Sequence, residues 1–414
     1  MNVGNEMKKS KMLWTGNRMP KNGAKKEMAL MSAEAMKEVH QFHRSFPQYC
    51  ETPLANLQCL AKLKGVGGIY VKDESYRFGL NAFKVLGGSY AMARFIAEQT
   101  GRSLAELGYE QLVSPEIKKE LGTYTFFTAT DGNHGRGVAW TANQIGQKAV
   151  VYMPKGSSEF RLNAIRKEGA RAEITELSYM GAVKRAYAES LETENSVVVQ
   201  DTAWPGYEEI PSWIMQGYGT MAMEAEMQLK ALGVTRPTHV FIQAGVGSAA
   251  GAVLGYFANQ HPEQCPVTIV VEAGSFECLY DSALKGDGSV VEAPGDKPTI
   301  MAGLACEEAN TVSWEILREK AAFFVSLGDT SAARAMRVLS APVGDDPRMV
   351  SGESGAAGMG ALLEMLDHPE YADFRAAAGI DENSQILLFS TEGDTDPEHY
   401  RHVVWDGAYP SDEG

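Results

Sequence analysis

The sequence predicts an α/β fold in which twisted, parallel-rich sheets are covered by helices. Short runs rich in β-branched and aromatic residues alternate with stretches of helical periodicity over most of the 414 residues. Several of these runs are apolar without alternation, which is typical of parallel strands that are covered on both faces. A chain of this length forms two domains or one large bilobed unit. The sequence therefore predicts a two-lobed α/β protein.

The expected elements follow one another in this order. Residues 1–30 are rich in Lys, Asn, Gly and Met without periodicity, so we expect a mobile polar arm. A helix is expected between Ser32 and Pro47, because apolar residues recur there at helical spacing. Loops rich in Gly, Asp and Pro are expected over residues 286–297 and 341–358. Seven strands are expected, over residues 68–71, 124–128, 149–153, 196–200, 238–243, 267–271 and 386–389.

Composition and charge exclude several classes of function. The formal net charge is −15, and no run of Lys and Arg in the folded body supplies the basic stripe that a nucleic acid needs. No apolar run approaches the ~20 residues of a membrane-spanning helix. The basic N-terminus lacks the apolar stretch of a secretory signal, while an organellar presequence stays an alternative. The five cysteines show no CxxC spacing, so we expect a reducing, cytoplasmic location and no metal site.

One lysine stands where a reactive side chain is expected. Lys84 follows the strand over 68–71 and directly precedes a helix that begins at Val85, and it is framed by Asn81 and Phe83. The positive end of that helix and local burial both disfavour the ammonium form. Such a lysine can act as a neutral nucleophile toward a carbonyl group. The alternative is an ordinary lysine near a surface turn.

A glycine loop joins the strand over 238–243 to the helix that follows it. The loop residues are Gly245, Val246, Gly247, Ser248 and Ala249. Such a loop directs backbone N–H groups and a helix N-terminus toward an anion, typically a phosphate. A dinucleotide site with Glu272 on the ribose is one alternative, although the G-x-G-x-x-x-G spacing is one residue longer than that fingerprint. A plain turn is the other alternative.

A second glycine-rich turn follows the strand over 124–128. It contains Asp131, Asn133 and His134, and three glycines within the six residues 132–137. The glycines allow a ligand to approach the backbone closely. Polar residues at a strand end stand where ligands bind in parallel sheets. The alternative is a helix cap, and His134 is expected to pack rather than to react.

Four strings carry a resemblance to a known family. They are RFGLNAFKVLGGSYA (77–91), TDGNHGRG (130–137), QDTAWPGYEEIP (200–211) and STEGDTDP (390–397). From about Tyr49 onward the chain resembles the fold-type II enzymes that use pyridoxal 5'-phosphate (PLP), the family of threonine deaminase, tryptophan synthase β-subunit and cysteine synthase. Among these, the strings are most similar to the diaminopropionate ammonia-lyases.

The resemblance implies a role for each conspicuous residue. Lys84 would bind PLP covalently, and Asn133 would bond the 3'-oxygen of its ring. Residues 245–249 would hold its phosphate, and Ser390, at the end of the last expected strand, would meet its pyridine nitrogen. Because Ser390 is neutral, that nitrogen is expected to stay unprotonated, which favours β-elimination over transamination.

The resemblance also implies a reaction, the conversion of 2,3-diaminopropionate to pyruvate and two molecules of ammonia, with both D and L isomers accepted. Asp131 and Asp201, the latter at the end of the strand over 196–200, explain the choice of substrate. A carboxylate gains a charge-assisted hydrogen bond from the second ammonium group, which serine and threonine lack. Lys84 and Asp131 would be the two bases, one on each face of the substrate.

Two lobes and a homodimer are implied as well. The large lobe would comprise residues 1–86 and 217–414, and the small lobe residues 87–216 would close on the substrate. Three other functions remain as alternatives. They are a serine/threonine dehydratase of the same fold, a non-catalytic amino-acid- or PLP-binding protein, and a nicotinamide-dependent oxidoreductase.

Overall fold

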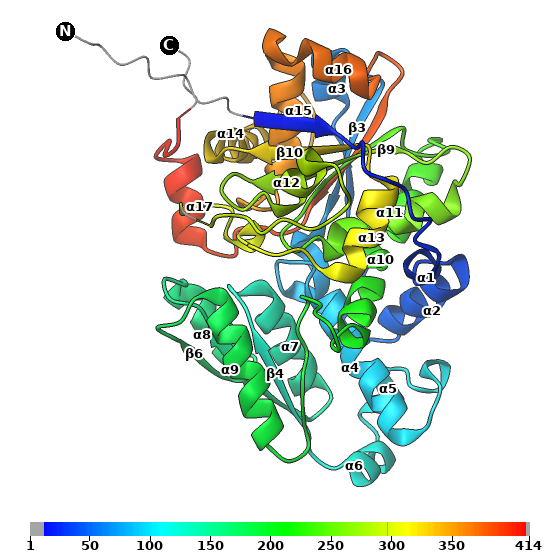
Figure 1. Cartoon of the computed structure of the whole chain (residues 1–414), viewed down its shortest axis with the longest axis vertical. Coiled ribbons are helices and arrows are strands. Elements are labelled where there is room, and N and C mark those ends of the chain that lie inside the picture. The colour runs from blue at the N-terminus through cyan, green and yellow to red at the C-terminus, as the bar shows by residue number, and fades with distance from the viewer. Residues whose placement is uncertain (1–11, 296, 411–414) are drawn as a thin grey trace, which may run out of the picture.

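Two sheets organise the chain, each in its own lobe (Figure 1). The computed structural model describes residues 12–295 and 297–410. The larger sheet has the strand order β1-β10-β9-β8-β11-β3-β2, and the smaller has the order β6-β5-β4-β7. Only the edge pairs β1–β10 and β2–β3 are antiparallel, so the predicted parallel-rich α/β fold is confirmed. The strands are β1 (Met12–Gly16), β2 (Leu54–Asn56), β3 (Gly68–Asp73), β4 (Thr125–Ala129), β5 (Lys148–Met153), β6 (Arg171–Ile174), β7 (Ser196–Val198), β8 (His239–Gln243), β9 (Val267–Ala273), β10 (Phe323–Leu327) and β11 (Gln385–Ser390).

Helices cover both sheets (Figure 1). The α-helices are α1 (Lys25–Ala29), α2 (Ala33–Arg44), α3 (Gln58–Lys64), α4 (Val85–Thr100), α5 (Tyr109–Leu112), α6 (Pro115–Leu121), α7 (Asn133–Gln144), α8 (Glu159–Lys167), α9 (Tyr179–Glu192), α10 (Glu209–Ala231), α11 (Ser248–Gln260), α12 (Cys278–Lys285), α13 (Thr311–Lys320), α14 (Asp329–Ser340), α15 (Ala357–Asp367), α16 (Ala372–Ala378) and α17 (Pro397–Val404). Short 3₁₀ turns are η1 (Glu74–Gly79), η2 (Leu104–Glu106), η3 (Ala302–Leu304) and η4 (Pro369–Tyr371).

All seven expected strands are present, as β3, β4, β5, β7, β8, β9 and β11. Four strands were not predicted, namely β1, β2, β6 and β10, and the first three of them are edge strands. β1 and β2 pair at the edges of the large sheet, and β6 is a polar strand at the edge of the small one. Residues of an edge strand are exposed on one side, so they need no continuous apolar run. β10 is apolar and mostly buried, and it begins at Phe323, shortly after α13 ends at Lys320.

The N-terminal arm corrects one expectation. Residues 12–30 are built into the large lobe, while residues 1–11 lie outside the described residues. β1 adds antiparallel to β10, and its Met12 N donates to Tyr371 Oη at 3.1 Å. Met12 and Met19 are buried. The expectation of a mobile arm is therefore wrong for residues 12–30, because edge pairing and two buried methionines hold a segment whose composition alone looks polar.

The expected helix after residue 32 is confirmed as α2. Ser32 is its N-cap, and Ser32 Oγ accepts a hydrogen bond from Ala35 N at 3.3 Å. Met36, Val39 and Phe42 form its buried face.

The two lobes meet where α4 packs against α10. The boundaries expected near residues 87 and 217 fall inside these helices. A Cβ at Gly217 would overlap the carbonyl of Leu86, and a Cβ at Gly87 would lie 2.5 Å from the ring of Tyr218. The backbones therefore approach closely at the junction. Helix α4 begins directly after Lys84, so this contact positions the lysine between the lobes.

No helix in the described part of the chain has the length and apolar character needed to cross a membrane.

Candidate active site

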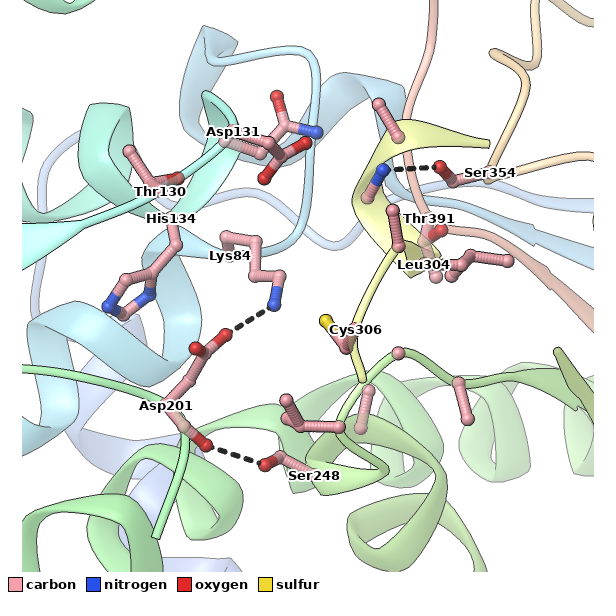
Figure 2. A pocket seen from close by; sticks show the side chains of 18 of the residues that line it. Lys84, Thr130, Asp131, His134, Asp201, Ser248, Leu304, Cys306, Ser354 and Thr391 are labelled. Atoms are coloured by element: carbon pink, nitrogen blue, oxygen red, sulfur yellow. Dashed lines mark hydrogen bonds and ion pairs between the residues drawn. The ribbon is translucent and has the colours of Figure 1, made fainter. Parts of the chain in front are cut away.

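A cavity lies between the lobes, at the carboxyl ends of β4, β8 and β11, and its empty space is about 800 Å³ including its opening to solvent (Figure 2). This is the edge at which ligands bind in parallel α/β sheets. The cavity brings together nearly all the residues that the sequence predicted for the site. They are Lys84, Asp131, Asn133, Asp201, Gly245, Val246, Gly247, Ser248 and Ala249.

Lys84 points into the cavity between Asp131 and Asp201 (Figure 2). Its Nζ is 2.6 Å from Asp201 Oδ2, and the Asp201 side chain is 5% exposed. Burial lowers the pKa of Lys84, but the Asp201 carboxylate outweighs burial, and the net pKa lies above the ordinary value. Burial raises the pKa of Asp201, but the Lys84 ammonium outweighs burial and lowers that pKa to about 2. The sequence favoured a neutral Lys84, whereas here the Asp201 carboxylate, from a distant strand end, stabilises the ammonium form.

The Lys84 segment is held by the chain that follows β11. Asn81 has a φ of 60°, in the left-handed region that turns the chain sharply. Gly393 N donates to Asn81 O at 3.0 Å, and Phe83 N donates to Thr391 O at 3.1 Å. A Cβ at Gly393 would overlap the Asn81 side chain, so glycine is required there. Lys84 is thus fixed relative to the carboxyl end of the central strand β11.

The glycine loop forms the wall opposite the Asp131 turn. Gly247 has a φ of 96° and is the N-cap of α11, whose first-turn N–H groups lack intrahelical partners. Ser248 Oγ donates to Asp201 O at 3.0 Å. A Cβ at Gly245 would lie 2.9 Å from Cys306 Sγ, so the backbone packs tightly there. The start of α11 therefore directs free N–H groups, which suit an anion, into the cavity next to the Lys84–Asp201 pair.

The Asp131–Asn133 turn lies at the start of α7. Asp131 is 28% exposed, and its Oδ2 accepts a hydrogen bond from Arg161 Nη1 at 3.2 Å. Asn133 Nδ2 donates to Glu392 Oε2 at 2.5 Å. His134 is buried, bonds a main-chain carbonyl through Nε2, and burial lowers its pKa. The turn therefore presents Asp131, Asn133 and His134 to the cavity, and His134 is also packed against the main chain as expected.

Ser390 does not line the cavity. It is the last residue of β11, is 1% exposed, and donates through Oγ to Ser351 Oγ at 2.8 Å. The next residue, Thr391, lines the cavity, and its Oγ1 accepts a hydrogen bond from Gln243 Nε2 at 2.8 Å. Successive side chains along an extended chain point to opposite sides. The structure therefore directs Thr391, and not Ser390, toward the cavity.

Four further side chains at or beside the site escaped the sequence analysis. Glu392 is 2% exposed, and burial raises its pKa although Arg161 opposes the shift. Tyr179 also lines the cavity. Thr391 and Glu392 stand in the STEGDTDP string, which therefore contained a signal for them. Arg161 lies on α8, 30 residues from Asp131, and no motif marked it.

An outer vestibule of about 1470 Å³ adjoins the cavity and opens to solvent. Asp131 and Tyr179 line both spaces. Arg161, Glu353 and Asp396 line the vestibule only. Asp131 therefore stands at the rim between the cavity and the vestibule.

The structure also bears on the dinucleotide alternative. Glu272 accepts hydrogen bonds from Leu279 N at 2.8 Å and Tyr280 N at 2.7 Å, and burial raises its pKa. It thus caps α12 and does not line the cavity, which disfavours a ribose contact. Within residues 12–295 and 297–410, no cluster of three or more His, Cys, Asp or Glu side chains is placed to hold a metal ion.

Comparisons with known proteins add independent findings. The family described as pyridoxal-phosphate dependent enzyme matches residues 46–378. A diaminopropionate ammonia-lyase of Salmonella typhimurium is 49% identical over 391 residues, which cover 94% of this chain and 96% of the relative. A crystal structure of diaminopropionate ammonia lyase from Escherichia coli in complex with D-serine matches with a TM-score of 0.88 and 45% identity, over 97% of this chain and 98% of that one.

The same Escherichia coli enzyme, in complex with an aminoacrylate-PLP azomethine reaction intermediate, matches with a TM-score of 0.87 and 45% identity, over 96% of this chain and 98% of that one. The similarity therefore extends over both lobes and confirms the predicted fold.

Proposed function

Since the chain belongs to the pyridoxal-phosphate dependent enzymes, and within them to the diaminopropionate ammonia-lyases, we propose that it converts 2,3-diaminopropionate and water to pyruvate and two molecules of ammonia. One observation carries the proposal. The amine of Lys84 and the carboxylates of Asp131 and Asp201 face the same cavity, beside the N–H groups at the start of α11.

The residues of the cavity fit PLP. Lys84 is the lysine within it, and the N–H groups at the start of α11 suit a phosphate. Asn133 would bond the ring 3'-oxygen, and Thr391, rather than Ser390, would meet the pyridine nitrogen. A threonine hydroxyl is neutral like that of serine, so the pyridine nitrogen is again expected to stay unprotonated. When bound, PLP supplies an electron sink for negative charge at the substrate Cα.

The chain itself supplies the proton transfers. Lys84 Nζ accepts the Cα proton from one face of the substrate, and a carboxylate oxygen of Asp131 accepts it from the other. Asp201 Oδ2, at 2.6 Å, orients the Lys84 amine and stabilises its charged form. Two bases on opposite faces allow both the D and the L isomer to react.

The same carboxylates select the substrate. The β-ammonium of 2,3-diaminopropionate gains a charge-assisted hydrogen bond from Asp131 or Asp201, whereas the hydroxyl of serine gains less. The small lobe, residues 87–216, carries Asp131, Asn133 and Asp201 and closes on the large lobe, which excludes water. We also propose that the protein is cytoplasmic and forms a homodimer. Sedimentation of the purified protein tests the homodimer.

A substrate comparison tests the proposed function. Purified protein supplied with PLP should release pyruvate from 2,3-diaminopropionate with a kcat/KM at least tenfold above that for D-serine, L-serine or L-threonine. A preference for a hydroxy amino acid would make the protein a dehydratase of the same fold. The absence of pyruvate from all four, with PLP bound, would leave the binding-protein alternative.

A further inference from the structure

A ring of hydrogen bonds encloses the Asp131–Asn133 turn. Arg161 Nη1 donates to Asp131 Oδ2 at 3.2 Å, and Arg161 Nη2 donates to Thr395 Oγ1 at 3.3 Å. Thr395 Oγ1 in turn donates to Glu392 Oε2 at 3.3 Å, and Asn133 Nδ2 donates to the same oxygen. We call these five residues the turn ring. Both ends of the turn are therefore connected to the segment that follows β11, Asn133 directly and Asp131 through Arg161.

Arg161 is the one cation in the turn ring, and the fold surrounds it. Its side chain is 8% exposed. A Cβ at Gly132 would lie 2.9 Å from Arg161 Cδ, so the arginine stem packs directly on the glycine of the turn. Among the described residues, Arg161 is the only hydrogen-bond or ion-pair partner of the Asp131 side chain. A buried arginine that packs on the turn and bonds its carboxylate restricts where that carboxylate can lie.

The turn ring also joins the two lobes. Arg161 lies on α8 of the small lobe, whereas Thr395 and Glu392 belong to the large lobe. A second bond beside it, from Ser158 Oγ to Asp396 Oδ2 at 2.6 Å, links the starts of α8 and α17, which face each other across the lobes (Figure 1). The segment after β11 also holds Lys84. Through Arg161, Asp131 is therefore connected to the same segment, residues 391–395, that positions Lys84.

We propose that Arg161 is a positioning residue for Asp131. It holds the carboxylate at the rim of the cavity, at the correct place relative to Lys84, and touches neither the substrate nor PLP. The inference rests on the proposed function, in which Asp131 is the base for one isomer. A displacement of about 1 Å in a catalytic group can cost ~10²-fold in rate.

The test compares both isomers of 2,3-diaminopropionate across five PLP-loaded proteins. These are the wild type, Arg161→Met, Arg161→Lys, Asp131→Asn and the double variant Arg161→Met with Asp131→Asn. Arg166→Met is the matched control, since Arg166 is exposed on the same helix and bonds only a main-chain carbonyl. Lysine cannot donate to Asp131 and Thr395 in the forked geometry of arginine.

Arg161→Met should lower kcat by ~10- to 100-fold for the isomer that depends on Asp131, and by less than about threefold for the other. Arg161→Lys should fall between wild type and Arg161→Met. In the Asp131→Asn background, Arg161→Met should change the rate for that isomer by less than about twofold, because two residues that act through one step are not additive. An equal loss for both isomers, or a loss that persists in the double variant, would overturn the proposal.

A crystallographic measurement gives a readout apart from activity. In crystals of PLP-loaded Arg161→Met, the Asp131 side chain should change rotamer or become disordered, while Lys84 and the glycine loop keep their places. An unmoved Asp131 would overturn the proposal even if activity fell. A failure of the proposed function itself is seen separately, as a wild type that makes no pyruvate.

Discussion

At the scale of single residues, the proposed function predicts that a change at Asp131 affects the two isomers of the substrate unequally. Asp131→Asn keeps the shape of the side chain but removes a proton acceptor. The loss of a general base costs ~10²–10⁴-fold in rate. The loss should fall mainly on one stereoisomer, expected to be the D form, because Lys84 still removes the proton of the other. Steady-state kinetics on each isomer measure the difference.

Unequal and equal losses mean different things for Asp131. An equal loss for both isomers would assign Asp131 to binding the β-ammonium and not to proton removal. Rates near wild type for both would reduce it to a helix cap, and the account of substrate choice would fail with it. Asp373→Asn, exposed on α16, is the control, and it should leave both rates unchanged.

The Lys84–Asp201 pair predicts a pH-dependent stability in protein freed of PLP. The pKa of Asp201 is lowered to about 2, so its contribution is complete above the unfolded value near ~3.9 and is lost as the pH falls toward 2. The pKa of Lys84 is raised, so its contribution is lost only at alkaline pH. Asp201→Asn leaves a buried charge unpaired and should lower the free energy of unfolding by about 3 kcal/mol at pH 7.

Urea unfolding at pH 7 and pH 3 measures this contribution. The difference between wild type and Asp201→Asn should shrink by roughly 1 kcal/mol at pH 3, because Asp201 is then partly protonated in the unfolded chain and is close to its folded pKa. A difference that stays constant or grows in acid would mean that the pair does not stabilise the fold in the way its geometry implies.

At the scale of elements, helix α10 is tied to β3 and η1 by charges that are fully buried. Glu224 on α10 lies 2.7 Å from Lys72 Nζ and 2.7 Å from Arg77 Nη2, and all three side chains are 0% exposed. Burial raises the pKa of Glu224, but Arg77 and Lys72 lower it to about 2. Removing one charge leaves the others uncompensated.

Glu224→Gln should therefore lower the free energy of unfolding by about 3–5 kcal/mol. The exposed Glu209→Gln on the same helix is the control and should change it by less than about 1 kcal/mol. Chemical denaturation of both variants measures the two effects. A Glu224→Gln effect no larger than that of the control would show that the buried charges do not hold α10 in place.

The elements show what local patterns can and cannot predict. The apolar strands of the sheet centres were predicted because burial on both faces demands continuous β-branched runs. β1, β2 and β6 were missed, since their places depend on partner strands far along the chain. Local patterns also predicted three site residues, because strand ends and helix starts mark Lys84, Asp131 and Asp201. Arg161 was not predicted, because nothing near it in the sequence reveals that its side chain reaches the Asp131 turn.

The shift from Ser390 to Thr391 has a similar origin. A string resemblance locates a segment within a residue or so, but the direction of a side chain at a strand end depends on where the strand stops. Glu392 also lies in the STEGDTDP string, but only the structure shows that its carboxylate bonds Asn133. Position along the chain was predicted well, and side-chain direction was not.

At the scale of the whole molecule, the two lobes are expected to move against each other. The α4–α10 contact at Leu86 and Gly217 is too tight to slide, so it should act as the pivot. Crystals of the PLP-loaded protein with and without a substrate analogue should show residues 87–216 rotated as a body, with Asp131 brought toward Lys84. Identical lobe positions in both crystals would contradict closure.

The central claim is that Lys84 carries the cofactor of an ammonia-lyase. Reduction of the PLP-loaded protein with borohydride, followed by peptide mapping, tests it most directly. The account predicts one reduced cofactor per chain, attached to the peptide that contains Lys84, together with loss of activity on both isomers. A label on any other lysine, or no label on protein that binds PLP and releases pyruvate, would contradict it.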